Sequence, residues 1–194
     1  MNPMKKLVAL LFVVMLPVSA TAEVVDLNIG EDSARLNLQG PFSRLLNDTQ
    51  GVYDLGLLSN RDSSRKLVQG HAGVLLSGDV GAREAAIQAG LGARFLIADV
   101  NGAGTSSAVA LGGQIEGRIP QLVRLGFLAQ VYGAPSATSF SDLDRYIEYA
   151  LAIDYQIIRQ ASVYLGYRNV NYKFSTGSGQ TVDSGLHLGV RLNF

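Results

Sequence analysis

The last thirteen residues of the chain, Val182 to Phe194, alternate between two kinds of side chain. A period of two predicts a β-strand with one apolar and one polar face. An amphipathic strand that ends on an aromatic residue is a hazard at an open sheet edge, because it pairs with other chains. In a closed barrel the same strand seals the sheet and turns its apolar face toward lipid. The apolar face carries Val182, Ser184, Leu186, Leu188, Val190, Leu192 and Phe194, and the polar face carries Asp183, Gly185, His187, Gly189, Arg191 and Asn193.

The same alternation recurs along most of the chain. It is clearest over Ala85–Ile97, where seven apolar residues occupy every second position. The longer runs match the roughly 9–11 residues that a tilted membrane strand needs. We therefore predict strands over Val25–Ile29, Arg35–Leu38, Val52–Leu58, Leu67–Ser77, Ala85–Ile97, Val109–Ile119, Val123–Val131, Ile147–Ile157, Val163–Tyr167 and Val182–Phe194.

These runs predict an all-β fold, a closed antiparallel transmembrane β-barrel of 8–10 strands. Ten is the preferred count, with the first two short runs forming a hairpin, and an irregular amino-terminal region would leave eight. The segment Gly40–Gln50 is the least regular, and we expect Phe42, Leu45 and Leu46 to form a short interfacial helical turn.

The connections between the runs differ in length. Asp99–Ser106, Ala134–Asp144 and Lys173–Thr181 are long and polar, whereas Pro120–Gln121 and Ile158–Gln160 are short. Long extracellular loops and short periplasmic turns are typical of outer-membrane barrels, so both termini should lie in the periplasm. Tyrosines cluster near the strand ends, and we expect them to form an aromatic girdle: Tyr53, Tyr132, Tyr146, Tyr155, Tyr167 and Tyr172.

The first 22 residues have the features of a secretory signal peptide. Lys5 and Lys6 precede the apolar run Leu7–Leu16, and Ala20-Thr21-Ala22 provides a small-residue cleavage site. The apolar run is shorter than the roughly 20 residues that a membrane-spanning helix needs. We expect cleavage before Glu23, so that residues 23–194 form an outer-membrane barrel.

The composition argues against several classes of function. The chain has 16 basic and 16 acidic residues, and loss of Lys5 and Lys6 leaves 14 against 16. There is no basic excess for nucleic acid, and without cysteine there is neither a disulfide nor a thiolate metal site. The segment Gly102–Ser106 lacks the Gly-Lys-Ser/Thr of a phosphate-binding loop. We expect a monomer without a cofactor or a metal.

Three segments resemble the YfaZ family of outer-membrane proteins. They are VYGAPSATSFSDLDRYIEYALAIDY, YLGYRNVNY and the terminal GLHLGVRLNF. The resemblance implies an outer-membrane location and no established activity. Separately, the end of the chain resembles the signal that the barrel-assembly machinery reads, which would make this machinery and outer-membrane lipid its partners. The residues of this assembly signal are His187, Gly189, Leu192 and Phe194.

The polar faces predict a network of charges in the lumen. We expect Glu84 near Arg118, Arg124 near both Glu116 and Asp154, and Tyr164 beside Asp154. Such a network either fills a narrow lumen with ion pairs or forms the selectivity constriction of a small channel. Small side chains such as Gly90, Gly92 and Ala110 would leave room for a narrow wet path. The predicted network is Glu84, Arg94, Glu116, Arg118, Arg124, Glu148, Asp154, Arg168 and Arg191, with Asp54 and Asp183 on the same faces.

The predicted function is therefore a passive narrow pore or a structural barrel with a charge-paired lumen, passing a small solute if it is open. A second possibility is surface recognition, in which a loop, above all Ala134–Asp144, binds a partner. A third is a lipid-modifying hydrolase, for which only His71 and His187 could serve as imidazole bases. We expect both histidines to be polar lumen residues and the protein not to be an enzyme.

Overall fold

The computed structural model describes residues 24–44, 51–62, 66–80, 86–101, 104–175 and 179–194. The predicted signal peptide, residues 1–22, lies outside these ranges. Almost all of the described chain is β-strand, with two 3-10 turns, η1 (Phe42–Arg44) and η2 (Ser136–Thr138). The strands are β1 (Val24–Gly30), β2 (Ser33–Pro41), β3 (Val52–Asn60), β4 (Leu67–Asp79), β5 (Ile87–Val100), β6 (Gly104–Ile119), β7 (Leu122–Ala134), β8 (Ser139–Phe140), β9 (Leu143–Ile158), β10 (Ala161–Phe174) and β11 (Gln180–Asn193).

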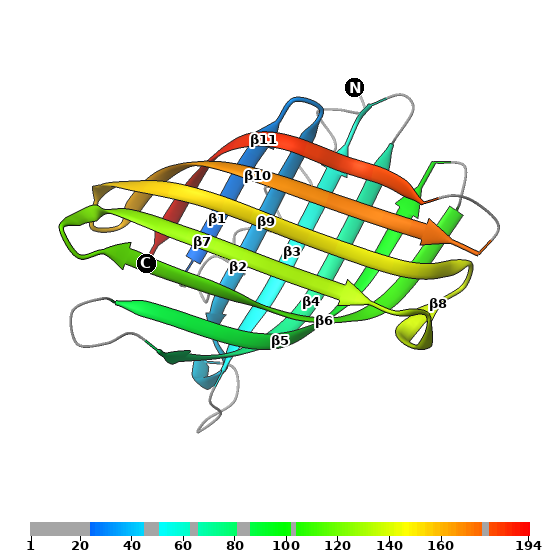
Figure 1. The fold of residues 1–194 in the computed structure, drawn as a ribbon, viewed down its shortest axis with the longest axis horizontal. Coiled ribbons are helices and arrows are strands. Elements are labelled where there is room, and N and C mark those ends of the chain that lie inside the picture. Colours follow the sequence, from blue (N-terminus) through cyan, green and yellow to red (C-terminus); the bar gives the residue numbers. More distant parts are fainter. Residues whose placement is uncertain (1–23, 45–50, 63–65, 81–85, 102–103, 176–178) are drawn as a thin grey trace.

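Ten of these strands close into an antiparallel barrel. Each pairs with its neighbours in the chain, β7 pairs with β9, and β1 pairs with β11, from Val24 opposite Asn193 to Gly30 opposite His187. The two-residue strand β8 adds a short pairing to β6. In Figure 1 the strands β9 to β11 cross the strands β1 to β4 at a large angle, as the tilted strands of opposite barrel walls do. The prediction of a closed barrel with ten strands is confirmed.

The alternation along each strand separates an apolar outside from a polar inside. On β5, Leu91 and Phe95 are 76% and 46% exposed, whereas Arg94 and Leu96 are only 5% and 1% exposed. The same contrast holds on β11, where Leu186 and Leu188 are exposed and His187 is buried. Because successive side chains of a strand point to opposite faces, the apolar residues form a continuous outer band that fits a lipid environment.

Both described ends of the chain lie at one end of the barrel, since Val24 pairs with Asn193. We call this the terminal end. The two-residue turns Pro120–Gln121 and Arg159–Gln160 also lie there. The connections between β2 and β3 and between β4 and β5 are longer, although both are at the terminal end, and the two-residue connection between β1 and β2 lies at the opposite end. Loop length therefore does not separate the two ends completely.

The predicted polar loop Asp99–Ser106 is much shorter in the structure. β5 continues to Val100 and β6 begins at Gly104, with Asp99 opposite Thr105. The β-branched Val100 and Thr105 fit a strand, and Gly104 adopts a positive φ of 75° that glycine tolerates. In the predicted loop Ala134–Asp144, η2 and β8 form a short ordered cap.

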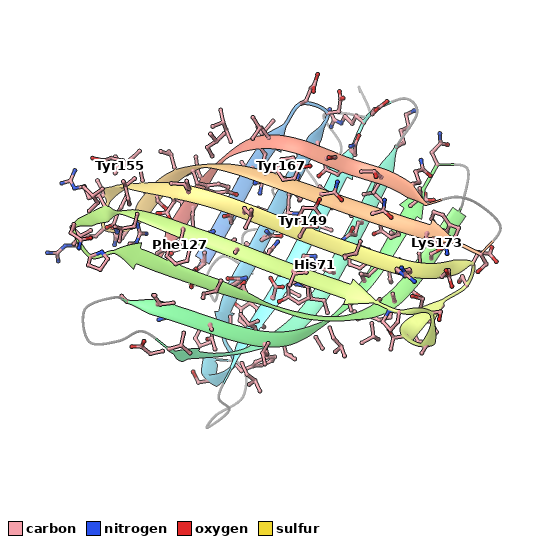
Figure 2. The ribbon with its side chains drawn as sticks, in the orientation of Figure 1. His71, Phe127, Tyr149, Tyr155, Tyr167 and Lys173 are labelled. Atoms are coloured by element: carbon pink, nitrogen blue, oxygen red, sulfur yellow. The ribbon has the colours of Figure 1, made fainter. Side chains whose placement is uncertain are left out.

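The tyrosines are divided between the two faces, so the predicted girdle is only partly correct. Tyr155 and Tyr167 are 46% and 37% exposed on the β9–β10 wall (Figure 2), together with Tyr149. Three others occupy inward positions of their strands and are buried: Tyr132, Tyr146 and Tyr172. Tyr53 has the outward parity of the exposed Leu55 and Leu57 on β3, and it is only 6% exposed because its ring lies over Gly40 and beside Phe42. Position near a strand end suggested an interface, but the parity of the alternation determines the face.

The predicted helical turn in Gly40–Gln50 is found as η1 at Phe42–Arg44, while Leu45 and Leu46 lie outside the described residues. No helix in the described ranges is long and apolar enough to cross a membrane.

A charge on the outer band tests the assignment of the faces. Leu91→Arg places a cation well inside β5, and we expect the free energy of unfolding in phospholipid vesicles to fall by about 2–4 kcal/mol. Val80→Arg is the matched control, because Val80 follows the end of β4 and is already 60% exposed. We expect it to cost at most about 1 kcal/mol. Urea titration followed by circular dichroism measures both values, and equal losses would contradict the assignment.

Candidate functional site: the charge-paired lumen

An ion pair between opposite walls lies in the middle of the lumen. Arg35 on β2 donates to both carboxylate oxygens of Glu148 on β9, at 2.6 and 2.8 Å. Three strands, β1, β11 and β10, lie between them in the sheet order. Glu148 is fully buried and also accepts hydrogen bonds from the Tyr146 hydroxyl and from Nε2 of Gln130. The bidentate geometry and the additional donors compensate for the cost of burying this carboxylate.

A second ion pair adjoins the first. Nε of Arg94 donates to Asp54, and the guanidinium lies 3.6 Å from the centre of the Tyr132 ring. Nη1 of Arg94 is 3.8 Å from Glu148 Oε1, so the two pairs are electrostatically linked. Nε2 of His71 lies 3.4 Å from the same Asp54 carboxylate.

Arg168 joins four strands on the side of the barrel that closes between β11 and β1. Its Nε donates to Asp183 at 2.6 Å, Nη1 to Asn28 Oδ1 at 2.7 Å, and Nη2 to Ser33 Oγ at 3.2 Å. The side chain is only 3% exposed. We call the three buried arginines and their carboxylate partners the charge belt: Arg35, Arg94, Arg168, Asp54, Glu148 and Asp183.

A second group of charges lies nearer the terminal end, and we call it the mouth group: Asp26, Glu116, Arg118, Asp154 and Arg191. Nε of Arg191 donates to Asp26 Oδ2 at 3.2 Å, and its Nη1 is 3.8 Å from Glu116 across the lumen. The Tyr164 hydroxyl also donates to Asp26, at 2.6 Å. Three of these side chains are more exposed than the charge belt, Glu116 at 38%, Arg118 at 32% and Arg191 at 17%, whereas Asp26 and Asp154 are buried.

The predicted ion pair between Arg124 and Asp154 is wrong, because Asp154 pairs with Arg118 instead. Nη1 of Arg118, not Arg124, lies 2.7 Å from Asp154. Gly126 on β7 is opposite both Arg118 on β6 and Asp154 on β9. Because glycine has no side chain, the side chains of Arg118 and Asp154 meet above it. Arg124 lies exposed at the end of β7, and its carbonyl accepts a hydrogen bond from Arg118.

The other predicted neighbours have mixed outcomes. The carboxylate of Glu116 lies near Arg191, on the opposite wall, rather than near Arg124. Tyr164 is opposite Asp154, as predicted. Glu84 lies outside the described residues. The predicted lumen network did not include Arg35, Asp26 and Asn28, although the alternation along β1 and β2 indicates that their side chains point inward.

Polar and aromatic side chains close the lumen at the end opposite the termini. The Tyr172 hydroxyl donates to Gln69 Oε1 at 2.7 Å, which links β10 directly to β4 on the other wall. Around this contact lies a buried cluster that we call the apolar plug: Leu58, Leu67, Leu96, Ala98, Val100, Ala108, Ala110, Tyr132, Ala134, Leu143, Tyr146, Val170, Tyr172, Phe174 and Val182.

The small inward residues do not leave a path through this region. The Tyr132 ring packs against Gly112, directly opposite it on β6. Ala108 and Ala110 are fully buried within the apolar plug. Large and small side chains therefore interdigitate, as in other protein interiors.

The terminal half of the lumen is hollow. A cavity of about 310 Å³, the terminal-end cavity, is lined by the mouth group, by the three arginines of the charge belt and by several amides. An adjoining cavity of about 180 Å³ shares Gln39, Gln88, Gln114 and Glu116 with it. No described residue of the apolar plug lines either cavity, and the three arginines of the charge belt form part of the wall of the larger one.

The two histidines lie in the lumen but at separate places. His71, labelled in Figure 2, contacts Asp54 in the charge belt, whereas His187 packs edge-on against the Tyr164 ring at 5.8 Å. Each imidazole lies over a glycine on the neighbouring strand, His71 over Gly56 and His187 over Gly166. A side chain at either glycine would collide with the ring.

The residues of the predicted assembly signal occupy both faces of β11. His187 is buried in the lumen, while Leu192 and Phe194 are 38% and 68% exposed on the outer face. Gly189 is opposite Tyr164, whose ring occupies the space that a side chain at position 189 would need. This glycine therefore has a packing role in the folded barrel.

Comparisons with known proteins identify one family. A family model described as YfaZ precursor matches residues 4–194. A comparison with curated proteins finds no match. A chain described under "Unveiling the Mechanism Behind the in-meso Crystallization of Membrane Proteins" is 13% identical, over 88% of this chain and 81% of that one, with a TM-score of 0.43. A similarity this low adds nothing to the argument.

The contribution of the charge belt to stability can be measured by comparing the same substitution at a buried glutamate, Glu148, and at a partly exposed one, Glu116. Glu148→Gln removes the charge that neutralises the buried Arg35, and we expect the free energy of unfolding to fall by about 3–5 kcal/mol. Glu116→Gln alters a partly exposed carboxylate that lies 3.8 Å from Arg191, its nearest cation among the described residues, so we expect a loss of about 1 kcal/mol or less. Denaturant titrations of both variants in vesicles test this difference, and equal effects would show that the belt does not stabilise the barrel.

Proposed function

Since this chain belongs to the YfaZ family, we propose that it is a small structural barrel of the outer membrane whose lumen does not conduct. The observation that carries this proposal is the hydrogen bond between Tyr172 and Gln69, which joins opposite walls inside the apolar plug. The charge belt forms a second closure. An aqueous path would have to disrupt both layers, and it would leave the buried charges of the belt without their partners.

We further propose that the terminal end faces the periplasm. The shortest turns at this end, Pro120–Gln121 and Arg159–Gln160, agree with the usual layout of outer-membrane barrels. In this orientation the terminal-end cavity opens toward the periplasm, and the apolar plug lies toward the cell exterior.

Surface recognition is a second candidate function, supported by the ordered cap between β7 and β9. The hydroxyls of Thr138 and Ser139 both donate to the carbonyl of Pro135, and Phe140 on β8 is opposite Ser107 on β6. Phe140 is nevertheless 50% exposed. A preformed loop with an exposed aromatic side chain loses little entropy when it binds a partner.

The positions of the histidines favour the view that the protein is not an enzyme. His71 approaches a carboxylate that Arg94 already binds, and His187 packs against an aromatic ring. Both imidazoles are buried within the network, which favours a structural role over that of a hydrolytic base.

Planar-bilayer recording tests the proposed closure. We expect the wild-type barrel to give no stepwise conductance, because both the apolar plug and the charge belt cross the lumen. A variant with both layers shortened, Arg35→Ala, Glu148→Ala, Tyr146→Ala and Tyr172→Ala, should conduct if circular dichroism shows that it folds. Regular current steps from the wild-type protein would overturn the proposal in favour of a narrow pore.

Thiol labelling provides a control that does not depend on removing the plug. The chain has no cysteine, so Gln88→Cys in the terminal-end cavity is the sole target for a membrane-impermeant reagent. We expect labelling in opened cells, where the reagent reaches the periplasm, and no labelling in intact cells. Labelling in intact cells would indicate either a path through the lumen or the opposite orientation, and the conductance of the wild-type protein distinguishes the two.

A further inference from the structure

The terminal-end cavity is large enough to hold more than structural water. Its volume of about 310 Å³ corresponds to about ten water molecules at the density of the liquid. A small organic molecule of metabolite size would fit in the same space. The proposed structural role of the barrel does not require such a cavity.

Guanidinium groups outnumber carboxylates among the described residues that line this cavity. The belt carboxylates Asp54, Glu148 and Asp183 do not line the cavity; they bind their arginines from positions outside its lining. The arginines themselves do line it. The lining therefore contains five guanidinium groups, Arg35, Arg94, Arg118, Arg168 and Arg191, against three carboxylates, Asp26, Glu116 and Asp154. The belt carboxylates neutralise three of these guanidinium groups, so Arg118 and Arg191 are the two that belong to the mouth group.

Several guanidinium nitrogens retain hydrogen-bonding capacity. Arg118 contacts Asp154 and the Arg124 carbonyl through Nη1, and its side chain is 32% exposed. Arg191 donates to Asp26 through Nε, while its Nη1 is too far from Glu116 for a hydrogen bond, at 3.8 Å. Deeper in the lumen, Nε of Arg35 has no hydrogen-bond partner among the described residues.

We propose that the terminal-end cavity binds a small organic anion through Arg118 and Arg191. Guanidinium groups hold carboxylate and phosphate groups alike through paired N–H donors, so the ligand bears one of these two groups. The amides of Gln88, Gln114 and Gln130 also line the cavity and provide partners for its uncharged polar part. Glu116 at the mouth opposes the anion and limits its affinity.

Isothermal titration of the full mature chain, refolded in zwitterionic micelles, tests this proposal. The probes are succinate for a carboxylate, inorganic phosphate for a phosphate, putrescine for a cation and glucose for a neutral polar molecule. We expect saturable binding of succinate or phosphate at one site per barrel, at least tenfold tighter than binding of putrescine or glucose. The tighter of the two anions identifies the class of ligand.

Three single variants separate a site from general attraction to the barrel. Arg118→Gln should weaken binding of the preferred anion at least fivefold, whereas Glu116→Gln should strengthen it several-fold. Arg159→Gln is the matched control, because Arg159 is an exposed cation in a turn at the same end and does not line the cavity. It should leave the affinity unchanged. Circular dichroism verifies that each variant is folded.

The proposal is overturned if neither anion binds saturably, which would mean that the cavity holds only water. Preference for putrescine or glucose over both anions would also overturn it. So would a loss of affinity in Arg159→Gln equal to that in Arg118→Gln, or weaker binding in Glu116→Gln. None of these outcomes bears on the conductance of the barrel, so the structural proposal is tested separately.

Discussion

The ion pair between Arg35 and Glu148 is the interaction on which the interior of this barrel depends. It connects two walls that share no hydrogen-bonded edge, and Glu148 also binds Tyr146 and Gln130. A buried ion pair contributes little net stability compared with apolar packing, but removal of one partner is very costly. The pair therefore fixes how the opposite walls lie relative to each other, and the other charges of the lumen are arranged around it.

The lumen changes character along the barrel axis. At the terminal end, charged groups that include the partly exposed Glu116 and Arg118 line a hollow space, and in the middle the side chains of the charge belt are almost fully buried. Beyond the belt, large residues such as Tyr132 pack over glycines such as Gly112. The lumen is therefore hollow at the terminal end and filled with side chains at the opposite end.

The sequence alone predicted the barrel, its ten strands and the face of most side chains, because these follow from a period of two and the length of each run. It did not predict the partners across the lumen. Hydrogen-bond register relates only neighbouring strands, whereas Arg35 and Glu148, or Arg191 and Glu116, meet across the interior. Asp154 pairs with Arg118 instead of Arg124 for a local reason, because Gly126, which lies between them in the sheet, has no side chain. The predicted girdle was wrong for Tyr146 and Tyr172, because both lie near strand ends but at positions whose parity turns the side chain inward.

A double-mutant cycle on Arg35 and Glu148 tests the central claim most directly. The free energies of unfolding would be measured for Arg35→Met, Glu148→Met and the double variant in phospholipid vesicles. The account predicts strong coupling, with each single variant costing about 3–5 kcal/mol and the double variant costing clearly less than their sum, because neither charge is then left buried alone. Additive losses would show that the two side chains act independently and that this pair does not hold the opposite walls of the barrel together.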